Sequence, residues 1–163
     1  MPQSSEVTSH AGLAKNIDRT RPDVGLKVLA DLLQAERRST PVVLMAGGIG
    51  SRLRPLTEDT PKPLLRVGNK PILEAIIDGF IAQGFHRFYL AVNYKARMIE
   101  AHFGDGARWN TEITYLYEEE RRGTAGALSL LPDQDEPLLV MNGDLVTNLN
   151  FGHLLNFHRE HAL

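Results

Sequence analysis

The chain has 163 residues, of which 42% are hydrophobic and 23% are charged, so it can bury a core as one domain. A net charge of −2 gives no general attraction to nucleic acid or to anionic membranes, and we expect neither as a partner. The absence of cysteine excludes disulfides, zinc–thiolate sites and thiol nucleophiles, and it agrees with a cytoplasmic location. No apolar run approaches the roughly 18 residues of a membrane span.

Residues 1–40 are predicted to form an N-terminal extension. Its first 23 residues are polar and lack the apolar segment of a signal peptide. A helix is expected from Asp23, because the following apolar residues share one helical face: Val28, Leu29, Leu32 and Leu33. The breaker Ser39-Thr40-Pro41 then ends this pattern, so a second unit is predicted over residues 41–163.

Strand and helix patterns alternate after Pro41. Apolar or alternating runs predict strands over residues 42–46, 87–94, 112–117 and 137–141. Helical spacing of apolar residues predicts helices over residues 72–81, 98–103 and 124–131, with a last helix after Asn150. This alternation predicts an α/β fold, a Rossmann-like three-layer α/β/α arrangement with a mainly parallel sheet and helices on both faces.

Three clusters of suggestive residues follow predicted strands, at residues 47–54, 118–126 and 142–144. Sheets of this kind bind ligands at the carboxyl ends of their strands. Because those ends lie on one edge of the sheet, we expect the three clusters to form one site.

The first cluster combines three glycines with three cations that follow them: Gly47, Gly48, Gly50, Arg52, Arg54 and Lys62. Glycine lets backbone N–H groups approach an anion closely, and nearby cations favour a polyphosphate. The loop lacks the Gly-Lys-Ser/Thr ending of a P-loop, and Leu53 stands where a dinucleotide loop has its third glycine. The alternatives are a tight turn and, for Lys62 between two prolines, a surface lysine.

The other two clusters suggest a metal ligand and a base-binding surface. Asp144 follows the apolar run 138–141, so its carboxylate is expected at the sheet edge, where Mg²⁺ or a turn could use it. The charged run 118–122 indicates a solvated edge. Small residues from Gly123 onward allow either a flat base against the backbone or close helix–sheet packing. The histidines near the C-terminus are interpreted as surface residues.

Together these motifs make the sequence similar to the sugar-1-phosphate nucleotidyltransferases, or nucleotide-sugar pyrophosphorylases. The family signature Ala-Gly-Gly-x-Gly-Thr/Ser-Arg-Leu-x-Pro-Leu-Thr stands at residues 46–57, and Pro-Lys-Pro follows at 61–63. Residues 123–128 and Asn-Gly-Asp at 142–144 match two further family features. The resemblance covers residues 41–161 and is strongest to mannose-1-phosphate guanylyltransferases. Some of these carry a preceding regulatory domain, and residues 24–40 are one candidate for its remnant.

The resemblance implies transfer of a nucleotide from an NTP, with GTP favoured, to a sugar 1-phosphate. The products are an NDP-sugar and pyrophosphate, and Mg²⁺ is the cofactor. It implies catalytic roles for Arg52 on the phosphates and Lys62 at the reacting centre, with Asp144 as the metal ligand. The implied nucleotide-binding residues are Ala46, Gly47, Gly48, Gly50, Ser51, Arg52, Glu118, Gly123, Thr124 and Asn142.

Two departures from the family pattern leave alternatives open. Arg121-Arg122 stands where the family usually has Pro-Leu, and the family's catalytic domain is longer than this chain. We therefore expect an amino-terminal half that lacks a second metal-binding aspartate and a lysine for the sugar phosphate. A non-catalytic nucleotide-binding or regulatory relative, or an inactive fragment, is the alternative function. A dinucleotide-binding oxidoreductase is disfavoured by the loop spacing, and a homo-oligomer is left open.

Overall fold

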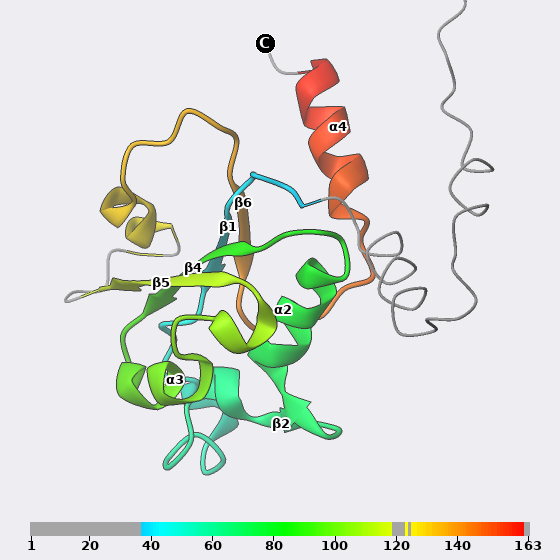
Figure 1. Cartoon of the computed structure of the whole chain (residues 1–163). Helices are drawn as coiled ribbons and strands as arrows, with labels where there is room; N and C mark the ends of the chain where they lie inside the picture. Colours follow the sequence, from blue (N-terminus) through cyan, green and yellow to red (C-terminus); the bar gives the residue numbers. More distant parts are fainter. Residues whose placement is uncertain (1–36, 119–122, 124, 162–163) are drawn as a thin grey trace, which may run out of the picture. The chain divides into compact units, whose positions relative to one another are not determined.

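The computed structural model describes residues 37–118, 123 and 125–161. The main elements of this part are a four-stranded sheet and three α-helices (Figure 1). The strands of the sheet are β1 (Val42–Met45), β4 (Arg87–Val92), β5 (Glu112–Tyr117) and β6 (Leu139–Asn142). The helices are α2 (Ile72–Ile81), α3 (Ala96–Phe103) and α4 (Phe151–His161).

The sheet has the strand order β5-β4-β1-β6, and every neighbouring pair is parallel. The apolar run of β1 lies between β4 and β6, and its first three residues are fully buried. Each strand begins and ends within a few residues of its predicted bounds. The predicted parallel sheet is therefore confirmed, and its carboxyl ends lie along one edge.

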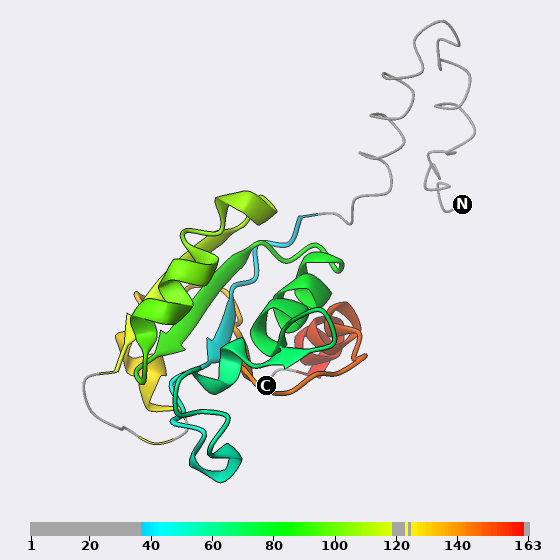
Figure 2. The same cartoon turned by 90° about the horizontal axis from the view of Figure 1, so that it is seen from below.

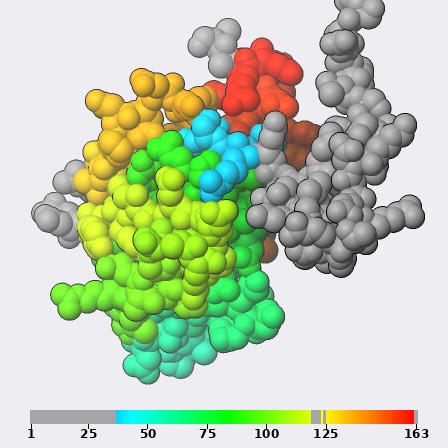
Figure 3. Space-filling view, in the orientation of Figure 1, coloured from blue at the N-terminus to red at the C-terminus, as the bar shows by residue number. Residues whose placement is uncertain are grey.

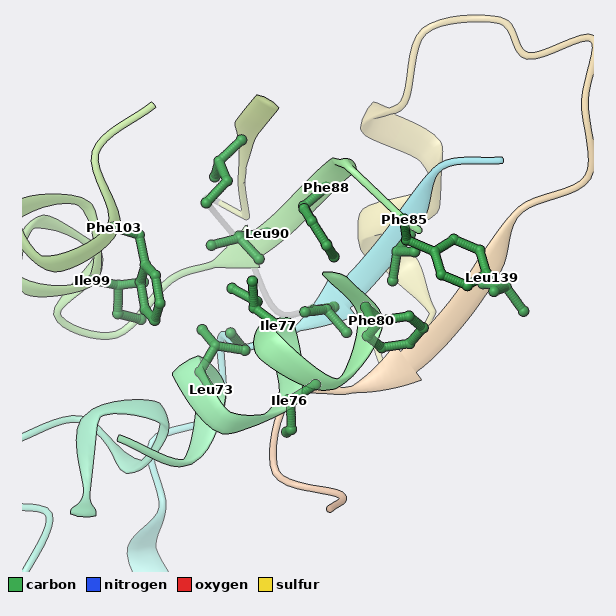
Figure 4. Close-up of a cluster of buried hydrophobic side chains, with 14 of the residues drawn as sticks. Leu73, Ile76, Ile77, Phe80, Phe85, Phe88, Leu90, Ile99, Phe103 and Leu139 are labelled. Carbon is green, nitrogen blue, oxygen red and sulfur yellow. The ribbon is translucent and has the colours of Figure 1, made fainter. Parts of the chain in front are cut away.

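The sequence of α2 explains its bounds. Pro71 immediately precedes the helix, where its missing N–H costs nothing, and Gly84 with a φ of 89° follows its end. The apolar residues recur with helical spacing, and the fully or nearly buried ones are Leu73, Ile76, Ile77 and Phe80 (Figure 4). The helix predicted over residues 72–81 is confirmed.

Aromatic side chains join α2 to α4 in the core. Phe80 is 1% exposed, and its ring stacks on Phe151 with the ring centroids 4.1 Å apart. The ring of Phe85 meets the ring of Phe80 edge-on, with the ring centroids 5.5 Å apart (Figure 4). Asn150 caps α4, because its side-chain oxygen accepts a hydrogen bond from the His153 N–H at 3.0 Å. The predicted last helix after Asn150 is confirmed, and Figure 3 shows it (red) at the surface.

The two faces of the sheet are covered differently. The three α-helices share one buried cluster with one face of the strands (Figures 1 and 2). The other face carries Val43, Tyr89 and Ala91, and it is covered by the 3-10 helix η5 (Gly126–Leu130) through Ala127. A regular α-helix was expected over residues 124–131. The segment ends before Pro132 as expected, but Ala125 has a non-helical φ of −117°, so only the five residues Gly126–Leu130 remain, and short helical segments commonly take the 3-10 form.

A small hairpin between β1 and α2 was not predicted. Its strands are β2 (Arg66–Val67) and β3 (Lys70–Pro71), joined at Gly68-Asn69. Two residues per strand are too few to show an alternating pattern. Residues 1–36 of the expected extension, including its helix after Asp23, lie outside the described residues. No helix of the described part is long and apolar enough to span a membrane.

Arg38 connects the segment before β1 to later parts of the fold. Its backbone N–H donates to the Gly84 carbonyl at 2.9 Å, and its Nε donates to the Gln83 carbonyl at 2.9 Å. Its guanidinium lies 5.6 Å from the centre of the Phe85 ring. A Cβ at Gly152 in α4 would stand only 2.7 Å from an Arg38 nitrogen, so Arg38 fills the space that this glycine leaves.

Candidate active site

A pocket of about 450 Å³ opens at the carboxyl edge of the sheet. It is lined by residues that follow three different strands, β1, β5 and β6, together with the segment around Lys62. The lining residues are Met45, Ala46, Gly47, Gly48, Lys62, Pro63, Glu118, Gly123, Asn142, Gly143 and Asp144. The three clusters expected at strand ends therefore meet in one place, as the parallel topology requires.

Two glycines of the pocket stand where a side chain would collide with its neighbours. A Cβ at Gly47 would lie 3.1 Å from Glu118 Oε2 and 3.3 Å from Asn93 Cβ. A Cβ at Gly143 would lie 3.0 Å from the Met45 carbonyl oxygen, which already accepts the Gly143 N–H at 2.9 Å. Gly48 has nothing within 4 Å of such a Cβ. Gly47 and Gly143 therefore serve close packing of the strand ends, whereas Gly48 faces open space.

These contacts predict that alanine lowers the stability of the protein at one of these glycines and leaves it unchanged at another. Gly143→Ala should lower the free energy of unfolding by about 1–3 kcal/mol, because a backbone carbonyl must move to admit the methyl group. Gly48→Ala should change it by about 0.5 kcal/mol or less. Urea unfolding followed by circular dichroism measures both. Equal stability of the two variants would contradict the packing role of Gly143.

Lys62 and Asp144 contact each other in the lining of the pocket. The Lys62 ammonium forms an ion pair with Asp144 Oδ2, although 82 positions separate the two residues in the sequence. Their side chains are 32% and 39% exposed, so both are accessible to a ligand. Lys62 begins a 3-10 helix (Lys62–Leu64) between the buried Pro61 and Pro63, which fix the backbone that carries it. The pocket thus presents a cation on a fixed main chain, paired with the Asp144 carboxylate, and Glu118 adds a second carboxylate to the lining.

The glycine loop (residues 47–50) is held at Gly50 by Thr57, which is 2% exposed, and Gly50 also lies beside Lys62. The Thr57 hydroxyl donates to the Gly50 carbonyl at 2.9 Å. Gly50 has a φ of 63°, and a Cβ there would be 2.8 Å from the Thr57 methyl and 3.2 Å from Lys62 Cβ. Glycine is therefore required at position 50 by both conformation and space. Loop and lysine are packed as one unit.

The structure brings eight of the residues implied by the resemblance to the pocket: Ala46, Gly47, Gly48, Lys62, Glu118, Gly123, Asn142 and Asp144. Gly50, Ser51 and Arg52 do not line it. Arg52 lies exposed in the 3-10 helix Ser51–Leu53 and forms no ion pair with another described residue. Thr124 lies outside the described residues. The binding and catalytic roles of all these residues stay predictions.

Comparison with known proteins identifies the family. The family model described as nucleotidyl transferase matches residues 41–163. The chain belongs to this family. Among its relatives, mannose-1-phosphate guanylyltransferase catalytic subunit beta of Drosophila pseudoobscura pseudoobscura is 38% identical over 128 residues. UTP–glucose-1-phosphate uridylyltransferase AglF of Haloferax volcanii is 40% identical over 119 residues. These relatives are sugar-1-phosphate nucleotidyltransferases.

Solved structures agree with this membership. HddC from Yersinia pseudotuberculosis, in a complex with GMP-PN, is 28% identical with a TM-score of 0.63. The match covers 73% of this chain and 54% of HddC. The two relatives above are covered to 34% and 49% of their length, with 76% and 72% of this chain matched. The chain therefore spans a third to a half of the relatives it matches.

Sequence reasoning missed two residues that lie behind the lining of the pocket. Asn93 follows β4 and contacts both Gly47 and Glu118, and Thr57 holds the glycine loop. The strand predicted over residues 87–94 included Asn93, whereas β4 ends at Val92, so the strand-end reasoning did not reach Asn93. Thr57 lies inside the signature, but its contact with Gly50 depends on the fold of the loop between them. Among the described residues, no group of three or more His, Asp or Glu side chains is arranged to hold a metal.

Proposed function

We propose that this chain supplies the nucleotide half-site of a sugar-1-phosphate nucleotidyltransferase. The reaction joins an NTP and a sugar 1-phosphate to give an NDP-sugar and pyrophosphate. The observation that carries the proposal is the pocket in which the Gly47-Gly48 turn, Lys62 and Asp144 meet at the carboxyl edge of a parallel sheet. Family membership supplies the reaction class.

The chemistry needs positioning and charge neutralisation more than proton transfer. A phosphate oxygen of the sugar phosphate attacks the α-phosphorus of the NTP, and the bond from that phosphorus to the pyrophosphate oxygen breaks. The nucleophile is already ionised, so no general base is required. Two unit charges about 4 Å apart repel by about 4 kcal/mol at an effective dielectric of 20. The Lys62 ammonium, released from Asp144, would bind phosphate oxygens and reduce this repulsion.

Asp144 fits the role of a magnesium ligand. Its carboxylate lines the pocket and is 39% exposed, and Mg²⁺ is commonly held by one or two carboxylates together with substrate phosphates and waters. A bound Mg²⁺ would neutralise charge on the phosphates. In the protein described here Asp144 is paired with Lys62, so we propose that both side chains change partners when nucleotide and metal bind.

GTP is the proposed nucleotide. This choice rests on the guanylyltransferase names of several relatives and on the GMP-PN in the HddC complex. The uridylyltransferase AglF is matched at similar identity, so UTP is the comparison that matters most.

Calorimetric titration of the chain tests the proposal. GTP, UTP, dTTP, CTP and ATP are each titrated with Mg²⁺ into protein whose folding has been checked by circular dichroism. We expect GTP to bind most tightly. Equal affinity for all five would contradict the choice of base. No binding of any of them to folded protein would contradict the proposed nucleotide site.

A further inference from the structure

The amide of Asn93 fixes one wall of the pocket without lining it. Asn93 directly follows β4, and its Nδ2 donates a hydrogen bond to the backbone carbonyl of Glu118. The Glu118 N–H donates in turn to the Val92 carbonyl at 3.0 Å. Val92 and Asn93, at the end of β4, therefore hold the N–H and the carbonyl of Glu118. Glu118 itself is the first residue after β5.

Gly47 stands beside the Glu118 side chain and beside Asn93. A Cβ at Gly47 would lie 3.4 Å from the backbone nitrogen of Asn93 and 3.3 Å from the Asn93 Cβ. It would lie 3.1 Å from Glu118 Oε2. Gly47, Asn93 and Glu118 thus meet where β1, β4 and β5 end. Gly47 and Glu118 line the pocket, and Asn93 lies directly against both. A shift of Asn93 would therefore change the distance between Gly47 and Glu118, and with it the width of this side of the pocket.

The turn that begins at Asn93 also contacts the segment that continues from the glycine loop. Lys95, which has a φ of 53°, donates from its Nζ to the Glu58 carbonyl. Glu58 follows Thr57, the residue that holds the Gly50 carbonyl. One short turn after β4 therefore contacts both the Glu118 wall and the loop that continues from the glycines.

We propose that Asn93 is a positioning residue for the nucleoside part of the ligand, acting through Glu118. This role rests on the proposed nucleotide site. The amide holds the Glu118 main chain, whose side chain reaches the Gly47 side of the pocket, so the nucleoside does not have to order this wall when it binds. Phosphates would contact Gly48, which has nothing within 4 Å of an added Cβ, and Lys62, whose backbone is fixed by Pro61 and Pro63 rather than by Asn93. Asn93 therefore affects the nucleoside part of the ligand more than its polyphosphate.

Asn93→Ala separates this role from a general loss of stability. The alanine keeps the Cβ that touches Gly47 and removes only the amide donor, and it adds no charge. The ligands are GTP and inorganic tripolyphosphate, each with Mg²⁺, in calorimetric titrations of the full chain. We expect GTP affinity to fall about three- to tenfold, the worth of one hydrogen bond, with tripolyphosphate affinity changed less than twofold. Asn69→Ala, in the exposed hairpin turn, is the matched control and should change neither.

Each other outcome has a distinct meaning. Unchanged GTP affinity in Asn93→Ala, or an equal fall for both ligands, would overturn the positioning role and leave the nucleotide site standing. No GTP binding to the unsubstituted, folded chain would overturn the proposed function and this role with it. If Asn93→Ala does not fold, Asn93→Asp keeps the size of the side chain and lacks the donor. Its added charge weakens both ligands, so there the GTP to tripolyphosphate ratio decides, and an unchanged ratio overturns the role.

Discussion

Lys62→Ala is expected to weaken binding of GTP with Mg²⁺ about ten- to a hundredfold. The ammonium is the cation that lines the pocket among the described residues, and one hydrogen bond to a charged group contributes about 1.5–3 kcal/mol. Stability should change by about 1 kcal/mol or less, because the ion pair with Asp144 is partly exposed. Calorimetry and urea unfolding measure the two effects.

Lys70→Ala is the matched control for this variant. Lys70 also forms an ion pair, with Asp78 at 2.5 Å, and the two side chains are 38% and 33% exposed. Neither residue lines the pocket. Loss of the Lys70 pair should therefore leave GTP binding within about twofold. If the two lysine variants bind GTP equally well, Lys62 has no special part in holding phosphates.

Removal of Lys62 should also have an opposite effect on the metal. In the unsubstituted protein the ammonium occupies the Asp144 carboxylate, so a cation that binds without nucleotide must displace it. Lys62→Ala removes this competition. We expect Mn²⁺, used as a probe in place of Mg²⁺, to bind Lys62→Ala more tightly than the unsubstituted protein while GTP binds more weakly. Electron paramagnetic resonance of Mn²⁺ measures the free ion, and a lower Mn²⁺ affinity in the variant would contradict the competition.

Phe80→Ala is expected to lower the free energy of unfolding by about 3–5 kcal/mol. The side chain is 1% exposed, and its ring contacts Phe85, Phe88 and Phe151, so its removal leaves a cavity between α2, β4 and α4. Urea unfolding followed by circular dichroism gives the value. Part of the loss should come from α4, because Phe151 loses the ring on which it stacks.

Phe157→Ala deletes the same side chain from the exposed side of α4. Phe157 is 60% exposed and stacks on His161 with the ring centroids 4.2 Å apart. Its replacement should change the free energy of unfolding by about 0.5 kcal/mol or less. A similar loss in both phenylalanine variants would mean that burial in the α2–α4 cluster is not what gives Phe80 its importance.

The elements with strong apolar periods were predicted well from sequence. In α2, apolar residues at helical spacing stand between Pro71 and Gly84, and in β1 a continuous apolar run fits a strand buried on both faces. The hairpin at Gly68-Asn69 and the 3-10 form of residues 126–130 were not predicted. The first is too short to show a period, and the second is shortened at its start by the non-helical conformation of Ala125, which its sequence does not indicate.

The site was predictable as a place but not as a set of contacts. Strand ends of a parallel sheet share an edge, so the clusters after β1, β5 and β6 were expected to meet. The pairing of Lys62 with Asp144 was not predictable, because it depends on β6 lying next to β1. Arg52 stands in the signature, but the left-handed Gly50 and the 3-10 helix after it leave Arg52 outside the lining of the pocket.

The contacts of Arg38 have a practical consequence for shortening the protein. The family match begins at residue 41, which invites expression of a chain that starts there. Such a chain would lose the guanidinium that occupies the space beside Gly152 and covers Phe85, at the junction of α4 with the end of α2. It would expose apolar surface at Phe85. It would also remove the hydrogen bonds that Arg38 donates to the backbone carbonyls of Gln83 and Gly84. A truncated form intended for crystallisation or binding work should therefore begin no later than Arg37.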